Sequence, residues 1–305
     1  MVMAPSAHQP VLLHEVVEAL HASAGDCIVD CTVGPGGHAE ALLEQLGPSG
    51  RLLGIDADPD AIELARRRLS RFGGSAILVN RSFVDLSAVC HEYGFHAVDG
   101  ILFDLGLSSM QVDSPERGFS FQRDAPLDMR FDPSRGLTAA DIINTYPERE
   151  IARILREYGE ERRARRIARS IVRSRPITST VRLARLVEQV LGSRRGRIHP
   201  ATRTFMALRI AVNQELDSLS SALAQTPDLL APGGRLVVIS YHSLEDRIVK
   251  QFMRSQARDS VLQLVSRKVI RPTSLEIESN PRSRSAKLRI AERSRQPDTS
   301  PRKEV

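Results

Sequence analysis

Residues 28–59, IVDCTVGPGGHAEALLEQLGPSGRLLGIDADP, constrain the fold of this 305-residue chain more than any other stretch. An apolar run enters a Gly-Pro-Gly-Gly loop at 34–37, a helix-like segment follows, and a second apolar run ends at Asp56. Glycine in such a loop lets the backbone approach a ligand without a Cβ in the way. Gly34 to Ala39 also fit the loose G-x-G-x-x-A dinucleotide fingerprint. The stretch predicts a strand–loop–helix–strand unit that binds a nucleotide-like ligand.

Short apolar runs and helical patterns alternate through the first third of the chain. The runs cover residues 27–32, 51–55, 76–80 and 98–103. Helical patterns such as 61–72 separate them, and the next clear strand is RLVVIS at 235–240, after a Gly-Gly turn. Strands that alternate with helices indicate a parallel sheet with helices on both faces. The expected class is therefore α/β, with a Rossmann-like domain.

The alternation stops between Asp104 and Arg235, where the sequence indicates a loop and then helices. Apolar residues recur at helical spacing over 151–172, and TFMALRIAVNQELDSLSSAL at 204–223 predicts one helix that returns the chain to the sheet. The expected domains are an α/β domain at 1–112 and 206–305 and a helical insertion at 113–205. The polar, proline-bearing tail at 294–305 is expected to be disordered.

Composition excludes several classes of protein. No apolar run reaches the roughly 18 residues that a membrane helix needs, and the first residues lack the pattern of a signal peptide. The three cysteines, Cys27, Cys31 and Cys90, form no C-x-x-C pair, so neither a disulfide framework nor a zinc site is favoured. We expect a reduced, cytoplasmic protein without a resident metal ion. The oligomeric state stays open, a homodimer included.

Charge is distributed unevenly along the chain. Residues 1–112 carry 6 basic and 14 acidic side chains. Residues 113–226 carry 21 basic and 14 acidic side chains, and residues 227–305 carry 16 basic and 9 acidic ones. Arginine is concentrated at 149–175, which holds ten arginines against four acids. Solvated helices are often rich in arginine, but a basic region of this size also suits a polyanion. The pattern favours nucleic-acid contact by the insertion.

The glycine loop and Asp56 alone fit a nicotinamide cofactor and S-adenosylmethionine equally well, because both contain an adenosine whose ribose a strand-end carboxylate can bind. Three observations favour S-adenosylmethionine. No tyrosine has a lysine four residues later, as a Tyr-x-x-x-Lys reductase would. LAPGGRLVVIS at 230–240 looks like the turn and fifth strand of methyltransferases that use this cofactor. ILFDLGLSS at 101–109 places Asp104 at the carboxyl edge of the sheet, where ligands of open α/β sheets bind.

Seven long segments, in order along nearly the whole chain, resemble one family. They are HQPVLLHEVVEAL (8–20), DCTVGPGGHAEALL (30–43), GIDADPDAI (54–62), ILFDLGLSSMQVDSPERGFSFQRDAPLDMRFD (101–132), HPATRTFMALRIAVNQEL (199–216), ISYHSLEDRIVKQF (239–252) and NPRSRSAKLRIAER (280–293). The chain is thereby similar to the MraW-type 16S ribosomal RNA N4-cytosine methyltransferases. The resemblance implies methyl transfer from S-adenosylmethionine to the exocyclic amine of one decoding-region cytosine in the small ribosomal subunit.

The resemblance also implies particular site residues. Gly36, Gly37 and His38 would contact the cofactor from the loop. Asp56 would hold the ribose, and Phe83 would flank the adenine. Asp104 and Gln111 would lie near the amino-acid end and the point of methyl transfer. Taken alone, without the resemblance, Phe83 is predicted to be a core residue and Gln111 a surface loop residue. The D/N-P-P-Y signature of amino methyltransferases is replaced by Asp104-Leu105-Gly106-Leu107, a departure that the family shares.

The residues also bear on the chemistry. Methylation at carbon 5 of a pyrimidine needs a cysteine nucleophile, and the chain has no Pro-Cys motif. An exocyclic amine needs only positioning and an acceptor for its N–H, for which Asp104 is the catalytic candidate, with Asp128 and Arg130 as weaker candidates for holding the base. Two alternatives remain: a DNA or protein amino methyltransferase on the same fold, or an RNA-binding assembly factor that has lost turnover. No contact with DNA or membrane is expected.

Overall fold

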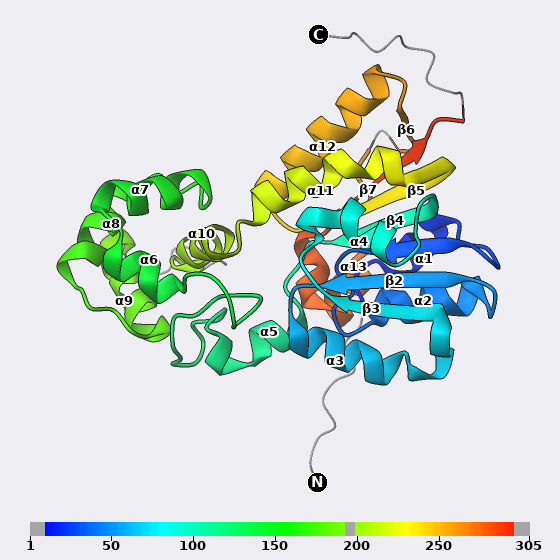
Figure 1. Ribbon diagram of the computed structural model, residues 1–305. Coiled ribbons are helices and arrows are strands. Elements are labelled where there is room, and N and C mark those ends of the chain that lie inside the picture. Colours follow the sequence, from blue (N-terminus) through cyan, green and yellow to red (C-terminus); the bar gives the residue numbers. More distant parts are fainter. Residues whose placement is uncertain (1–9, 193–198, 267, 296–305) are drawn as a thin grey trace. The chain divides into compact units, whose positions relative to one another are not determined.

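The computed structural model describes residues 10–192, 199–266 and 268–295. The chain forms two compact units (Figure 1). The first unit contains residues 1–106 and 216–305, and the second contains residues 107–215. The second unit thus extends past both ends of the expected insertion at 113–205. The expected disordered tail at 294–305 falls, from residue 296 on, outside the described residues.

The first unit is built on a seven-stranded sheet in the order β3-β2-β1-β4-β5-β7-β6. Strands β1 to β5 pair in parallel, β7 is antiparallel to β5, and β6 is antiparallel to β7. The strands are β1 (Cys27–Asp30), β2 (Arg51–Asp56), β3 (Ala76–Asn80), β4 (Val98–Asp104), β5 (Leu230–Ser240), β6 (Leu262–Leu264) and β7 (Lys287–Arg293). The helices are α1 (Leu13–Leu20), α2 (Gly37–Leu46), α3 (Pro59–Arg68), α4 (Leu86–Glu92), α11 (Glu215–Leu229), α12 (Ser243–Arg258) and α13 (Ser274–Ser279).

Helices cover both faces of this sheet, as the α/β class requires. Successive residues of a strand point to opposite faces. Ile28, Leu52 and Leu102 accordingly pack with apolar residues of α1, α2 and α3. Val29, Leu53 and Ile101 pack instead with those of α4, α11 and α12. Because the central strands are buried on both sides, their sequences are continuous apolar runs rather than alternating ones, which is why they stood out in the sequence.

The far edge of the sheet was only partly anticipated. The expected strand at 235–240 is part of a longer β5, whose pairing with β4 shifts register between Val98 and Gly100, so the Gly-Gly turn lies inside the strand. β6 and β7 were not predicted. β7 mixes charged and apolar residues, KLRIAER, and β6 has three residues. Such short or half-polar strands give a weak periodic signal.

The second unit is helical. Its helices are α5 (Ser109–Asp113), α6 (Ala139–Thr145), α7 (Glu148–Glu157), α8 (Ala164–Arg173), α9 (Thr180–Leu191) and α10 (Thr202–Asn213). The helical pattern over 151–172 is divided between α7 and α8, and Glu160 between them has a positive φ of 47°. Ile151, Leu155, Ile167 and Ile171 are nevertheless all buried in this unit's own core. The apolar spacing therefore survives the break in the backbone.

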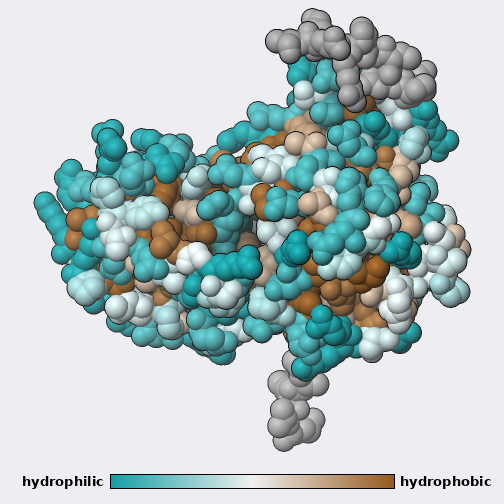
Figure 2. All heavy atoms as spheres, viewed as in Figure 1, coloured by the Kyte–Doolittle hydropathy of each residue, from teal (hydrophilic) through white to brown (hydrophobic). Residues whose placement is uncertain are grey.

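The expectation of one helix over 204–223 was wrong. α10 ends at Asn213, and Gln214 adopts a left-handed conformation with φ 50° and ψ 38° before α11 begins. An exposed glutamine carries no local signal for such a break, because glutamine is a good helix former. The surface view shows mainly hydrophilic residues on the face drawn (Figure 2). No helix among the described residues has both the length and the apolar character that crossing a bilayer demands.

We expect substitutions at Gln214 to test this break. A left-handed conformation costs an L-residue about 1–2 kcal/mol, and branching at Cβ adds to the strain. Gln214 already bears this cost, so Gln214→Val should lower the free energy of unfolding only by the added strain of its branched Cβ, about 1 kcal/mol, whereas Gln214→Gly should leave it unchanged or raise it slightly. Urea unfolding followed by circular dichroism measures both. Gln251→Val, an exposed position within α12, is the control; equal losses at 214 and 251 would contradict the prediction.

Candidate functional site

Polar residues end each of the five parallel strands. β1 ends at Asp30, β2 at Asp56, β3 at Asn80, β4 at Asp104 and β5 at Ser240. The carboxyl ends of parallel strands lie at one edge of the sheet, which is where ligands of open α/β sheets bind. Three carboxylates from neighbouring central strands therefore share this edge, and Tyr241 follows β5 at the same edge.

The loop from β1 to α2 is fastened to both neighbouring strands. The Cys31 N–H donates to the Leu102 carbonyl of β4, and the Val33 N–H donates to the Ile55 carbonyl of β2, each at 2.9 Å. The Gly34 N–H donates to Oδ2 of Asp56, also at 2.9 Å. The glycine loop is thus held in place by the sheet, and Asp56 is part of its anchor.

The loop glycines are needed for packing inside the protein. Gly36 has a positive φ of 85°, and a Cβ there would lie 3.3 Å from the Leu69 side chain. A Cβ on Gly37 would lie 2.5 Å from Cγ of Pro10, closer than real contacts allow. The glycines in the sequence predicted that the missing Cβ admits a ligand. The structure shows that it first admits Pro10 and Leu69, while the proposed cofactor contact of Gly36 and Gly37 stays a prediction.

Asp56 accepts two backbone hydrogen bonds. Its Oδ1 accepts from the Asp58 N–H at 2.9 Å, and its Oδ2 accepts from the Gly34 N–H. Burial raises the pKa of Asp56 to about 6, although these two N–H donors lower it. Each oxygen has a further lone pair, so the carboxylate can still accept from the hydroxyls of a ligand.

Asp30 is a site residue that the sequence argument missed. Its side chain is 1% exposed, Oδ1 accepts from the Thr32 N–H at 3.1 Å, and Oδ2 has no hydrogen-bond partner among the described residues. Burial, together with the charges of Asp104 and Asp56, raises the pKa of Asp30 to about 8, although the Thr32 hydrogen bond lowers it. Negative charge is therefore disfavoured at this carboxyl edge, and a cationic ligand bound there would stabilise the ionised form of Asp30.

Asp104 is held from three sides. Its N–H donates to Oγ1 of Thr32 at 2.6 Å, and its Oδ1 accepts from the Tyr241 hydroxyl at 2.8 Å. Its Oδ2 lies 3.7 Å from Nδ1 of His38. The Tyr241 ring lies against Gly106, where a Cβ would be 2.6 Å from the ring carbon Cε2. Gly106 therefore allows Tyr241 to reach and orient Asp104, a role that no motif in the sequence revealed.

His38 and Phe83 are both oriented by protein contacts. His38 is 6% exposed, and its Nε2 donates to the Val11 carbonyl at 3.0 Å, which ties α2 to the segment before α1. Phe83 is partly exposed and packs edge-on against Phe103 of β4, with ring centroids 5.5 Å apart. Phe83 thus packs against the core, as expected of it alone, while part of its side chain stays exposed. Cofactor contacts by these two residues stay predictions.

The remaining candidates belong to the second unit. Gln111 is buried in α5, and its Oε1 accepts from the Ser108 N–H in a capping box, so it is not the surface residue its context suggested. Arg130 donates to both oxygens of Asp128, at 2.9 and 2.7 Å. Burial would raise the pKa of Asp128, but the Arg130 hydrogen bonds lower it below its usual range. Asp128 and Arg130 therefore bind each other in this structure.

None of the three cysteines has the properties of a nucleophile. Cys31 and Cys90 are fully buried, and burial raises the pKa of each thiol well above its ordinary value. Burial and the nearby Asp99 also raise the pKa of Cys27. Since the thiolate is the reactive form, a covalent cysteine mechanism is disfavoured.

Comparison with known proteins gives a consistent result. A protein-family model described as the MraW methylase family matches residues 5–294. The "Ribosomal RNA small subunit methyltransferase H" of Dehalococcoides mccartyi is 55% identical in an alignment that covers 95% of this chain and 87% of that protein. The protein of the same name from Thermomicrobium roseum is 52% identical, over 94% of this chain and 93% of that protein. A solved putative rRNA methylase from Clostridium thermocellum is similar over 92% of this chain, with 15% identity and a TM-score of 0.44.

The raised pKa of Asp30 predicts a pH effect. Between about pH 4 and 8 the folded chain holds a proton that the unfolded chain has released. The free energy of unfolding therefore falls as pH rises through this range, and Asp30→Asn should reduce that fall. Urea unfolding of wild type and variant at several pH values measures it, with the exposed Asp60→Asn as control. If the wild-type and Asp30→Asn curves run parallel, Asp30 is ionised in the folded chain and the prediction is wrong.

Proposed function

Because the chain belongs to the MraW methylase family, we propose that it transfers a methyl group from S-adenosylmethionine to 16S rRNA of the small ribosomal subunit. The acceptor is the exocyclic N4 amine of a cytosine in the decoding region. The observation that carries the proposal is the carboxyl edge of the sheet, where Asp56 and Asp104 stand beside a glycine loop that β2 and β4 hold in place. The 52–55% identity to rRNA methyltransferases over almost the whole chain supports the RNA substrate.

The residues at this edge fit the cofactor. Asp56 keeps acceptor capacity for the two ribose hydroxyls, and the partly exposed Phe83 ring offers an apolar surface for the adenine. The cofactor carries a positive sulfonium and a positive amino group. The orphaned Oδ2 of Asp30 and the raised pKa values of Asp30 and Asp56 indicate that positive charge is favoured there. A negatively charged dinucleotide would be repelled by the same carboxylates.

Asp104 is the group that acts on the substrate in this proposal. When bound, S-adenosylmethionine supplies a methyl group activated on sulfonium sulfur. The Asp104 carboxylate accepts a hydrogen bond from an N–H of the target amine. This hydrogen bond orients the nitrogen lone pair and stabilises the positive charge that develops on the nitrogen. The Tyr241 hydroxyl restrains Oδ1 and the Thr32 hydroxyl restrains the Asp104 backbone. Both contacts hold the carboxylate in one orientation before the reaction, which is the main contribution a protein can make to an in-line transfer.

The second unit is proposed to hold the RNA. Four arginines are exposed, of which Arg162 and Arg163 directly precede α8 and Arg165 and Arg166 lie within it, while the helix buries Ile167 and Ile171. The helix can therefore pack and present charge at the same time. Arginine suits this purpose because its planar guanidinium binds phosphate through two parallel hydrogen bonds.

The ribose contact can be tested by comparing wild type and Asp56→Ala in their affinity for two ligands that differ in one ribose hydroxyl. Asp56→Ala should weaken binding of S-adenosylhomocysteine by about 1–3 kcal/mol, because two hydroxyls lose their acceptor. The variant also leaves the Gly34 and Asp58 N–H groups without their acceptor, which should weaken the binding of any ligand of this site. Calorimetry with the 2′-deoxy analogue separates this general effect from the loss of the ribose contact. Asp56→Ala should reduce the affinity for the deoxy analogue clearly less than the affinity for S-adenosylhomocysteine. Equal losses for both ligands would remove Asp56 from the ribose.

The product is the test of the function. Nucleoside mass spectrometry of 16S rRNA from cells lacking the protein should show the loss of N4-methylated cytidine and its return on complementation. Asp104→Asn keeps the shape and the Tyr241 contact but removes the charge, so methylation should slow by roughly 10- to 150-fold, equivalent to about 1.5–3 kcal/mol. Asp99→Asn, at the other end of β4, is the control.

Two results would contradict the product assignment. Loss of a carbon-5 methylcytidine or of a ribose methyl instead would overturn the N4 assignment. Cofactor binding without any methylated product in 16S rRNA would favour an assembly factor or a different acceptor. Wild-type rates with Asp104→Asn would retain the function and exclude Asp104 from the chemistry.

A further inference from the structure

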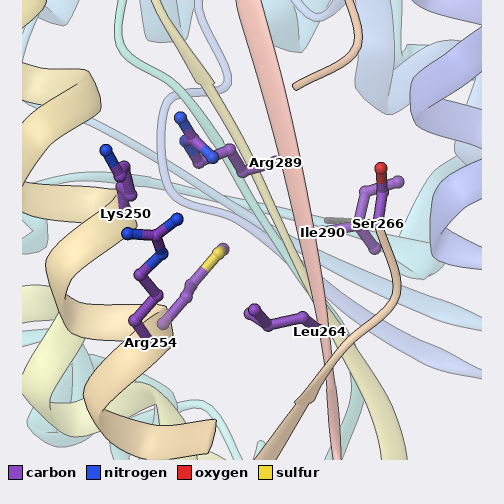
Figure 3. Close-up of a pocket in the computed structure, with 7 residues that line it drawn as sticks. Lys250, Arg254, Leu264, Ser266, Arg289 and Ile290 are labelled. Carbon is purple, nitrogen blue, oxygen red and sulfur yellow. The ribbon is translucent and has the colours of Figure 1, made fainter. Parts of the chain in front are cut away.

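A basic hollow lies in the first unit, on the part of the sheet edge formed by β6 and β7. It has a volume of about 240 Å³ and lies between α12 and these two strands (Figure 3). Its lining residues are Lys250, Met253, Arg254, Leu264, Ser266, Arg289 and Ile290. The sheet order places β6 and β7 beyond β5, whereas the cofactor-binding residues of the first unit belong to β2, β4 and the loops at their carboxyl ends. The hollow is therefore separate from the site described above.

The lining has the composition of an anion site. Figure 3 shows the nitrogen-bearing ends of Lys250, Arg254 and Arg289 on the same side of the hollow, with the Ser266 hydroxyl across from them. The other lining residues are apolar, and none of the described residues that line the hollow carries a carboxylate. The Ser266 hydroxyl already donates to the Lys268 carbonyl. Three cations on an apolar floor suit a phosphate, because a desolvated anion gains most from charge-assisted hydrogen bonds.

One of the cations is fixed in position. Nε of Arg289 donates to Oδ1 of Asp246 at 2.8 Å, and Nζ of Lys287 lies 3.3 Å from Oδ2. Burial would raise the pKa of Asp246, but the Arg289 hydrogen bond and both positive charges lower it, so the carboxylate is ionised. The single carboxylate of Asp246 thus pairs with both Arg289 and Lys287, and the three groups together keep a net positive charge. Within 10–192, 199–266 and 268–295, no acidic side chain pairs with Lys250 or Arg254.

The positive charge continues along α12. Arg247, Lys250, Arg254 and Arg258 follow one another at spacings of three or four, which places them on one side of the helix. A second hollow of about 580 Å³ shares Arg254 and Leu264 with the first and also includes Arg258. Cations therefore recur about every 6 Å along the helix axis. A row of this kind matches a chain of phosphates better than one free phosphate ion.

We propose that the hollow between α12, β6 and β7 binds a phosphodiester of the substrate RNA backbone, as an anchor separate from the arginines of the second unit. Lys250 and Arg254 supply the charge, Arg289 is held ready by Asp246, and the row continues toward Arg258. This inference rests on the proposed RNA substrate. It also explains why residues 227–305 carry 16 basic and 9 acidic side chains although they belong to the cofactor-binding unit.

The test compares two double variants with the same change in charge. Lys250→Gln with Arg254→Gln removes two cations from the hollow. The matched control, Arg66→Gln with Arg67→Gln, removes two exposed cations from α3, which packs beside β2 and β3 toward the opposite edge of the sheet. The probe is the 30S subunit from cells that lack this protein, titrated at several salt concentrations. Calorimetry with S-adenosylhomocysteine confirms that each variant is folded and binds the cofactor as wild type does.

The salt slope is the steepness with which the logarithm of the binding constant falls with the logarithm of the salt concentration. Loss of two phosphate contacts should lower this slope by nearly two. Between about 50 and 200 mM salt, wild-type affinity should then fall by about tenfold more than that of the Lys250/Arg254 variant. The control should keep the wild-type slope. An unchanged slope in the Lys250/Arg254 variant, with wild-type cofactor binding, would overturn the inference. Inorganic phosphate is a second probe. If the Lys250/Arg254 variant loses phosphate binding but keeps the wild-type salt slope with 30S subunits, the inference is also overturned, because the hollow then binds a small anion and not the RNA backbone.

Methyl transfer by the wild-type protein separates this inference from the proposed function. If wild type methylates 30S subunits and the salt slopes of the two variants are equal, only the anchor is wrong. If wild type neither binds nor methylates 16S rRNA in 30S subunits, the proposed function is wrong, and the anchor, which needs an RNA substrate, is overturned with it.

Discussion

The pairing of β1 between β2 and β4 is the constraint on which the rest of the site depends. This register brings the ends of three strands together, so that Asp30, Asp56 and Asp104 lie at one edge. It also places the loop after β1 where its N–H groups reach carbonyls on both neighbours and the side chain of Asp56. A slip of one residue would turn the apolar side chains of β1 to the wrong faces. The buried core therefore enforces the geometry of the polar edge.

That geometry has an electrostatic cost. Burial raises the pKa of Asp30 to about 8, and burial likewise raises that of Asp56 to about 6. The charged form of each group is disfavoured in the absence of a positive ligand, and proteins retain perturbed groups mostly where they serve a function. In the proposed function, a cofactor with a sulfonium and an ammonium group would favour ionisation of these carboxyl groups on binding. Its binding would therefore be favoured over that of an anionic dinucleotide.

The two proposed RNA contacts differ in how the chain forms them. α8 buries one side in its own unit and exposes arginines on the other, which a helical pattern in the sequence already indicates. The hollow beside α12 needs Lys250 and Arg254 from a helix and Arg289 from β7, some 40 residues later. Asp246 joins the two elements through Arg289 and Lys287. Only the antiparallel return of β7 against β5 brings these residues together.

The sequence by itself determined the α/β class, the central strands, the glycine loop, and the strand-end positions of Asp56 and Asp104. These follow from local apolar runs and turn residues, whose periodicity and spacing are visible without a structure. It did not determine the break at Gln214, the strands β6 and β7, or the roles of Asp30 and Tyr241. Gln214 breaks the helix against its local propensity, and β7 is stabilised by pairing with β5. Asp30 and Tyr241 acquire their roles from burial and from contacts with residues distant in the chain, such as Asp104 and Gly106, which only the tertiary structure decides.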